Sequence, residues 1–169
     1  MYDNSIEKLP EENDKFHFFN YGIGYGKDFY LLDDIIAQNG HSELTEMILK
    51  MDIEGFEYQT IYHADPEVLS KFSQIVIEFH DIINYTNLLI IPVLQKLNEQ
   101  FQCVHIHGQD VSPIVRVGDN RILPNYIEVT YLNKNFYEFT NEKCVIPLKI
   151  DMPTYRNRRE LYLGDWSYY

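Results

Sequence analysis

Two carboxylates follow a short apolar run and stand directly before a glycine. Asp52 and Glu54 come after Met47-Ile48-Leu49, and Gly55 follows them. Side chains two residues apart on a strand share a face, and glycine permits a sharp turn out of the strand. Ligands of open α/β sheets bind beyond the carboxyl ends of strands, so both carboxylates are candidates for a site. The alternative is that Glu54 or Glu57 caps the following helix, where negative charge is favoured.

A second group of ionisable side chains ends the next apolar run. Glu78 and His80, in Ile77-Glu78-Phe79-His80-Asp81, share a face by the same two-residue period. Adjacent parallel strands lie about 4.8 Å apart, so these side chains are expected close to Asp52. Such a cluster can hold a divalent cation or act as an acid–base group. A hydrogen-bonded structural cluster is the alternative.

Two histidines repeat the pattern on a third segment. His105 and His107 share one face of a short predicted strand, and a glycine and two polar residues ending in Asp110 follow. Two imidazoles on one face suit recognition of substrate hydroxyls or metal ligation. Because they come after two other polar strand ends, we interpret them as part of a site rather than as structural histidines.

The elements that must position these residues alternate between strand and helix. Strands are expected at 46–53, 74–79, 103–107 and 126–132, with a last edge strand at 145–150. Helices are expected at 31–38 and 56–63, as a turn at 67–71, and as an amphipathic helix around 90–101. This alternation predicts an α/β fold in one domain, residues 1–169, with a mostly parallel sheet. No helix precedes 126–132, so we expect an antiparallel edge strand there.

Composition excludes several classes of protein. The net charge of −12 argues against a nucleic-acid surface, which needs clustered Lys and Arg. Two cysteines form neither a disulfide framework nor a CxxC pair, which favours a cytoplasmic location. We find no signal peptide and no apolar run near the roughly 20 residues of a membrane span. We therefore predict no nucleic-acid partner and no membrane association.

Four segments, taken in order, resemble the FkbM-type S-adenosylmethionine-dependent methyltransferases. The first, residues 49–57, reads Leu-Lys-Met-Asp-Ile-Glu-Gly-Phe-Glu and resembles the family signature lKxDxEGxE. The others are 72–81, 104–107 and 124–131, and the resemblance covers roughly residues 2–151. It implies a Rossmann-like class I methyltransferase sheet, with strand order 3-2-1-4-5-7-6. The activity implied is O-methylation of a sugar or another small hydroxylated substrate.

The resemblance also assigns strands and cofactor contacts. Segments 46–53, 74–79, 103–107 and 126–132 correspond to strands four, five, six and seven. The acidic residue that holds the cofactor ribose falls on Asp3. The first strand and its glycine-rich loop would precede Met1, so the resemblance covers the C-terminal portion of the sheet and leaves open whether the chain is active alone. The fourth strand would then have an unpaired edge, which we expect a second copy or a partner chain to complete.

The resemblance implies roles for the candidate residues. Asp52 and His80 would be the catalytic pair near the acceptor hydroxyl, one of them as general base. The substrate-binding residues, which would orient hydroxyls or hold a divalent cation, are Glu54, Glu78, His105, His107 and Asp110. Two alternatives remain open. One is a non-catalytic binding or assembly module with the same fold, and the other is a metal-dependent hydrolase, which no hydrolase motif supports.

Overall fold

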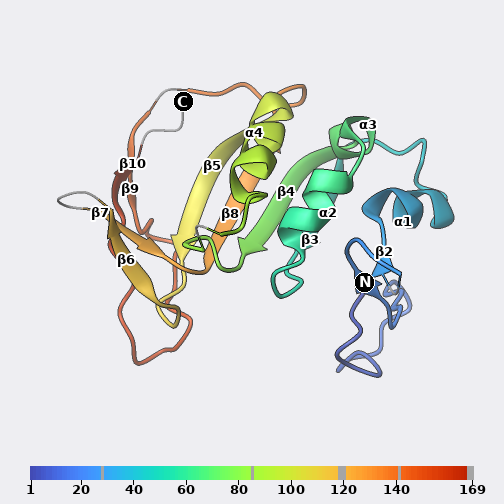
Figure 1. The fold of residues 1–169 in the computed structure, drawn as a ribbon, viewed down its shortest axis with the longest axis horizontal. Coiled ribbons are helices and arrows are strands. Elements are labelled where there is room, and N and C mark those ends of the chain that lie inside the picture. The colour runs from blue at the N-terminus through green and yellow to red at the C-terminus, as the bar shows by residue number, and fades with distance from the viewer. Residues whose placement is uncertain (28, 85, 118–120, 141, 167–169) are drawn as a thin grey trace.

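The computed structural model describes every residue except 28, 85, 118–120, 141 and 167–169. Its centre is a four-stranded sheet in the order β3 (Met47–Met51), β4 (Phe72–Phe79), β8 (Ile127–Asn133) and β5 (Phe101–Gly108). β3 and β4 are parallel, and β8 runs antiparallel to both β4 and β5 (Figure 1). The chain is therefore an α/β protein with a mixed sheet, in which β3, β4 and β5 point the same way.

The antiparallel strand lies inside the sheet, so the prediction of an antiparallel edge strand was wrong. β8 pairs with β4 on one side and with β5 on the other. The connection from β5 to β8 contains the hairpin of β6 (Ile114–Val117) and β7 (Arg121–Pro124), which sequence reasoning did not anticipate. This connection is long enough to return β8 between its neighbours, where the backbone groups on both of its edges are hydrogen-bonded.

Two helices cover one face of the sheet. They are α2 (Glu57–His63) and α4 (Ile90–Gln100), and the short α3 (Pro66–Ser70) leads into β4 (Figure 1). The helical spacing of apolar residues in α4 is confirmed as a buried stripe made of Ile90, Val93 and Leu97. The alternate β4 residues Ile75, Ile77 and Phe79 beneath the helices are fully buried. Burial of each such side chain stabilises the fold by about 1.5–3 kcal/mol.

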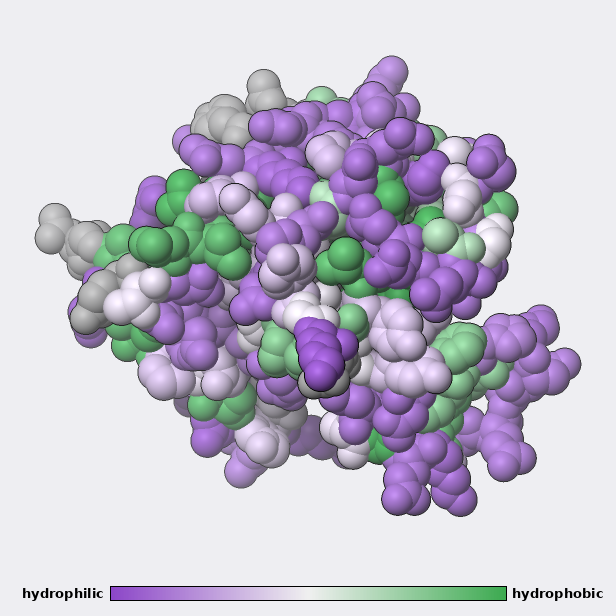
Figure 2. Space-filling model, turned by 45° about the vertical axis from the view of Figure 1, so that its right-hand side comes forward, coloured by the Kyte–Doolittle hydropathy of each residue, from purple (hydrophilic) through white to green (hydrophobic). Residues whose placement is uncertain are grey.

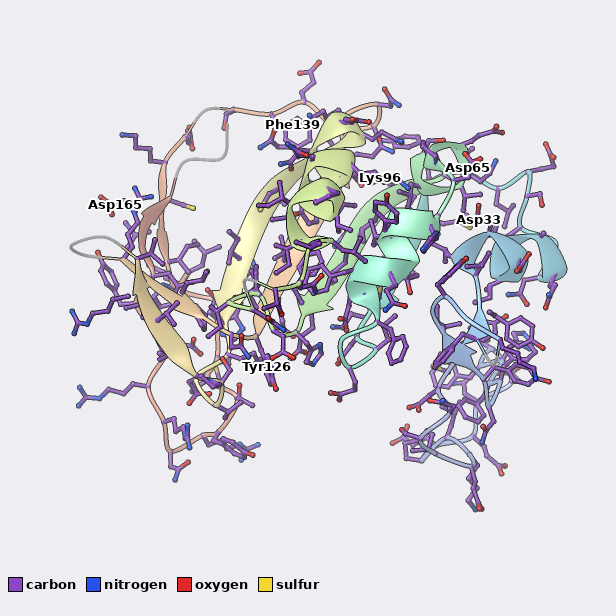
Figure 3. The ribbon with its side chains drawn as sticks, in the orientation of Figure 1. Asp33, Asp65, Lys96, Tyr126, Phe139 and Asp165 are labelled. Carbon is purple, nitrogen blue, oxygen red and sulfur yellow. The ribbon has the colours of Figure 1, made fainter. Side chains whose placement is uncertain are left out.

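Lys96 of α4 joins the helices at one end of this layer. Its Nζ donates to the carbonyl oxygen of Tyr62 at 2.9 Å and to that of Ala64. Asp33 and Asp65 lie close to it (Figure 3). The carboxylate of Asp33 also accepts from the backbone N–H of Asp65 at 2.9 Å. These contacts hold α4 against the end of α2, and the helix that contains Asp33 against the start of α3.

β3 forms one edge of the sheet. The pair β1 (Gly22–Ile23) and β2 (Phe29–Tyr30) and the helix α1 (Leu32–Gln38) lie beyond this edge (Figure 1). Within the described part of the chain, no strand pairs with the outer edge of β3, and Ile48 is 68% exposed.

The C-terminal part forms a separate two-stranded sheet, and its residues Ile146 and Leu163 pack into the main hydrophobic core. β9 (Cys144–Ile146) pairs antiparallel with β10 (Gly164–Trp166), so the predicted edge strand at 145–150 does not extend the central sheet. Residues 147–163, which we call the C-terminal strap, connect β9 to β10 and are tied by side chains to β5 and the residues after it. Cys103 and Cys144 are not joined in a disulfide.

The molecular surface is mostly hydrophilic. Figure 2 shows apolar residues scattered in small patches between hydrophilic ones on one face. Among the described residues, no helix has both the length and the apolar character that crossing a membrane requires.

Candidate functional site

His80 is the buried centre of the first predicted cluster. It directly follows β4 and is 7% exposed, and its ring packs against Tyr126 with 4.8 Å between centroids. The next residue, Asp81, has a left-handed φ of 53°, which is uncommon outside glycine. Asn125 Nδ2 donates to the Asp81 carboxylate at 2.7 Å. Asn125 and Tyr126, which immediately precede β8, therefore hold the turn that presents His80.

Glu57 fixes the tautomer of His80. This glutamate is fully buried, and its Oε1 accepts from the backbone N–H groups of Ile53 at 3.0 Å and Gly55 at 3.2 Å. The same oxygen lies 3.0 Å from Nδ1 of His80. Because a carboxylate oxygen only accepts hydrogen bonds, Nδ1 carries the proton and donates it. The lone pair of neutral His80 is therefore on Nε2.

Three carboxylates face that nitrogen. Glu54 Oε2 lies 3.5 Å from Nε2, and Asp52 Oδ1 and Glu78 Oε1 each lie 3.9 Å from it. Glu54 has a φ of 55° and Gly55 a φ of 98°, so the chain turns sharply after β3, as the glycine predicted. The structure thus brings together four predicted residues, Asp52, Glu54, Glu78 and His80. They lie at the carboxyl ends of two adjacent parallel strands.

This arrangement could hold a metal ion. One ligand atom from each of Asp52, Glu54 and His80 lies within 4.8 Å of the other two. Glu78 is suited to a different role. Its burial raises the pKa of its carboxyl group, and the negative charge of Asp52 raises that pKa further. Glu78 therefore accepts a proton more readily than an ordinary carboxylate does.

The structure places His107 in a second cluster. Its Nδ1 lies 3.0 Å from Glu128 Oε2, and its Nε2 lies 2.9 Å from Glu160 Oε2 in the C-terminal strap. The hydrogen bond to Glu128, with a smaller contribution from Glu160, raises the pKa of His107 to about 9. His107 is therefore charged at neutral pH and donates from both nitrogens. It bridges β8 to the strap and is not part of the His80 cluster.

His105 and Asp110 also contact the strap. His105 Nε2 lies 3.0 Å from Asp151 Oδ1. The carbonyl oxygen of Asp110 accepts from Arg158 Nη1 at 2.8 Å, and its carboxylate lies 3.7 Å from Nε of the same arginine. The predicted substrate-binding residues on and after β5 thus have partners within the chain, and the structure does not join them to His80.

Asp3, the predicted ribose contact, lies in an exposed turn. Its Oδ1 accepts from the backbone N–H of Ser5 at 2.7 Å and from the Ser5 hydroxyl at 2.6 Å. These two hydrogen bonds lower the pKa of Asp3. No contact described in the structure connects Asp3 to the His80 cluster.

Sequence reasoning missed several contributors to the two clusters, among them Glu160 of the C-terminal strap. Glu57 was interpreted only as a helix cap, Tyr126 as a strand residue, and Glu128 was not singled out. The signal for Glu57 was its place in the first turn after Glu54 and Gly55. Its complete burial, which makes it a partner for a histidine, depends on packing that a sequence pattern does not report.

Comparisons with protein-family models, with curated proteins and with solved structures found no match.

Proposed function

We propose that this chain is a methyltransferase-type protein that acts on the hydroxyl group of a sugar or another small hydroxylated substrate. The observation that carries the proposal is the sheet order β3-β4-β8-β5, with only the third strand reversed. It is the order that the family resemblance implies for strands four, five, seven and six. The His80 cluster lies at the carboxyl ends of the first two, where ligands of such sheets bind.

The residues of the His80 cluster would bind the acceptor hydroxyl and remove its proton. S-adenosylmethionine, when bound, would supply an electrophilic methyl group on its sulfonium. Asp3, whose Oδ1 accepts two hydrogen bonds from Ser5, stays the proposed contact of the cofactor ribose through its other carboxylate oxygen. Nε2 of His80, held by Glu57 through Nδ1, can receive the acceptor proton as general base. The carboxylates of Asp52, Glu54 and Glu78 can accept hydrogen bonds from neighbouring hydroxyls.

The experiment is calorimetric titration of the chain with S-adenosylhomocysteine, followed by a screen of sugars for methyl transfer. Binding and transfer that fall with Asp52→Asn or His80→Gln, and not with Glu99→Gln, would support the proposal. Glu99 is an exposed carboxylate at the end of α4, away from the cluster. A folded chain that binds neither the cofactor product nor an acceptor would contradict it.

The open edge of β3 favours a second candidate, a non-catalytic binding or assembly module. An unpaired strand edge is a template for another strand, so a homodimer or a partner chain would complete the sheet. Light scattering on the sample used for titration distinguishes the two. A stable dimer without cofactor binding favours the module, and cofactor binding with transfer favours the enzyme.

A further inference from the structure

We propose that Asp52, Glu54 and His80 bind one divalent transition-metal cation. Ligand atoms that share an ion at about 2.1 Å lie roughly 3–4.2 Å from one another. Nε2 lies 3.5 Å from the Glu54 oxygen and 3.9 Å from the Asp52 oxygen. The three ligand atoms all lie within 4.8 Å of one another, so rotations of the carboxylate side chains would place all three around one ion. Both carboxylates are on exposed side chains, which have room to rotate.

The second, independent observation is the burial and the hydrogen bonding of His80. Its side chain is 9% exposed, and Nε2 points at the carboxylates without a hydrogen bond in the part of the chain that the structure describes. A metal-binding imidazole commonly donates its other N–H to a carboxylate, which fixes the ring and makes the ligand more basic. Glu57 makes this contact at 3.0 Å, and two backbone N–H groups hold it in place. The acidic residues thus surround a ligand nitrogen that is already oriented.

The ligand set indicates the kind of cation. Mg²⁺ and Ca²⁺ prefer oxygen ligands only, whereas an imidazole with carboxylates suits Mn²⁺, Fe²⁺, Co²⁺ or Zn²⁺. The Glu54 side chain is 87% exposed and that of Asp52 43%, so one side of the ion would face solvent. Three protein ligands with open positions are typical of catalytic metal sites rather than closed structural ones. Glu78, whose Oε1 lies 3.9 Å from Nε2, would be a further carboxylate beside the cation.

A bound cation would change the role of His80, because Nε2 cannot be a ligand and a general base together. Cation binding itself does not depend on the methyl-transfer proposal. The experiment can therefore contradict one proposal and not the other, because cation binding is measured without cofactor or acceptor.

The experiment is a titration of the full chain with MnCl₂, followed by electron paramagnetic resonance. We expect one Mn²⁺ per chain and ¹⁴N modulation from a coordinated imidazole. Asp52→Asn and Glu54→Gln should each weaken binding at least tenfold, since each removes a charged ligand, and Glu99→Gln should leave it unchanged. Both ligands are exposed, so these variants test the site even if His80→Gln fails to fold. In a folded His80→Gln chain the ¹⁴N modulation should disappear.

Three results would overturn the proposal. The first is Mn²⁺ binding in Asp52→Asn and Glu54→Gln that equals binding in Glu99→Gln. The second is bound Mn²⁺ without ¹⁴N modulation in the unaltered chain. The third is displacement of Mn²⁺ by Mg²⁺ at about tenfold excess, which would indicate an all-oxygen site that does not use His80.

Discussion

Two histidines of this protein follow the same sequence pattern but have opposite surroundings. His80 and His107 are both buried, both lie at the carboxyl ends of strands, and both have carboxylates within 4 Å. His107 has a carboxylate on each nitrogen, at 3.0 and 2.9 Å. His80 has one on Nδ1 at 3.0 Å, while on Nε2 the nearest carboxylate lies at 3.5 Å.

This difference in the surroundings of Nε2 makes His107 a structural bridge and leaves His80 as the candidate site residue. Both nitrogens of His107 donate to carboxylates, so the ring is charged, has no free lone pair and stabilises the C-terminal strap. His80 is held through Nδ1 by Glu57, and its Nε2, with no hydrogen bond among the described residues, can act as a ligand or a base. The clusters are neighbours on the sheet, because Glu78 pairs with Glu128 and Glu128 with His107 in register. A position at the carboxyl edge of the sheet is therefore not enough to define a site. What distinguishes the two histidines is whether Nε2 already has a hydrogen-bond partner within the chain.

The largest expected effect is on catalysis. His80→Gln should lower kcat/KM for methyl transfer about 10²–10⁴-fold, the usual contribution of a general base or its equivalent. His107→Gln should leave kcat/KM nearly unchanged and lower the melting temperature instead. The measurement is initial rates with an acceptor from the screen, beside thermal unfolding of each variant. Similar rate losses in both variants would mean that the two clusters act together.

Glu57→Gln should have the next largest effect. The amide oxygen can still accept from the two backbone N–H groups, so the turn after β3 is kept. Loss of the negative charge makes His80 a poorer ligand, and we expect Mn²⁺ affinity to fall about 10–100-fold. Titration beside Glu99→Gln measures this. An unchanged affinity would show that Glu57 is only a structural cap.

The His107 bridge should weaken at high pH. Its pKa is raised in the folded chain from 6.5 to about 9, so the stabilisation is complete below about 6.5 and is lost as pH rises through about 9. The shift corresponds to roughly 3 kcal/mol, and we expect about 2 kcal/mol because the Glu128 side chain is 36% exposed and solvent screens it. Urea unfolding at pH 7 and pH 10 measures the loss. His107→Gln is the control and should show a correspondingly smaller loss over this interval.

The smallest effect should come from Glu160→Gln. The amide oxygen can still accept from Nε2 of His107, but the bond no longer joins opposite charges. We expect a loss of about 1 kcal/mol and faster hydrogen exchange within residues 147–163. Binding of Mn²⁺ should be unaffected. A change in Mn²⁺ affinity with unchanged hydrogen exchange in the strap would contradict the structural role given to the His107 cluster.

Local pattern explains which parts of the fold and the cluster could be predicted. The two-residue period of strands gave Glu78 and His80 a common face, and Gly55 predicted the turn that presents Asp52 and Glu54. Parallel neighbours then bring these strand ends together. Local pattern did not predict the position of β8, because a strand after a long connection can pair with either edge or with two neighbours; only the family resemblance implied a place between β4 and β5.

The sequence by itself determined the alternation of strands and helices, the polar residues at three strand ends and the net charge of −12. Only the tertiary structure decided which histidine keeps a free nitrogen. The partners that settle it come from distant segments, with Glu57 23 residues from His80 and Glu160 53 residues from His107. Hydrogen-bond donors and acceptors are assigned by geometry in three dimensions, and a one-dimensional pattern records the residues without their pairing.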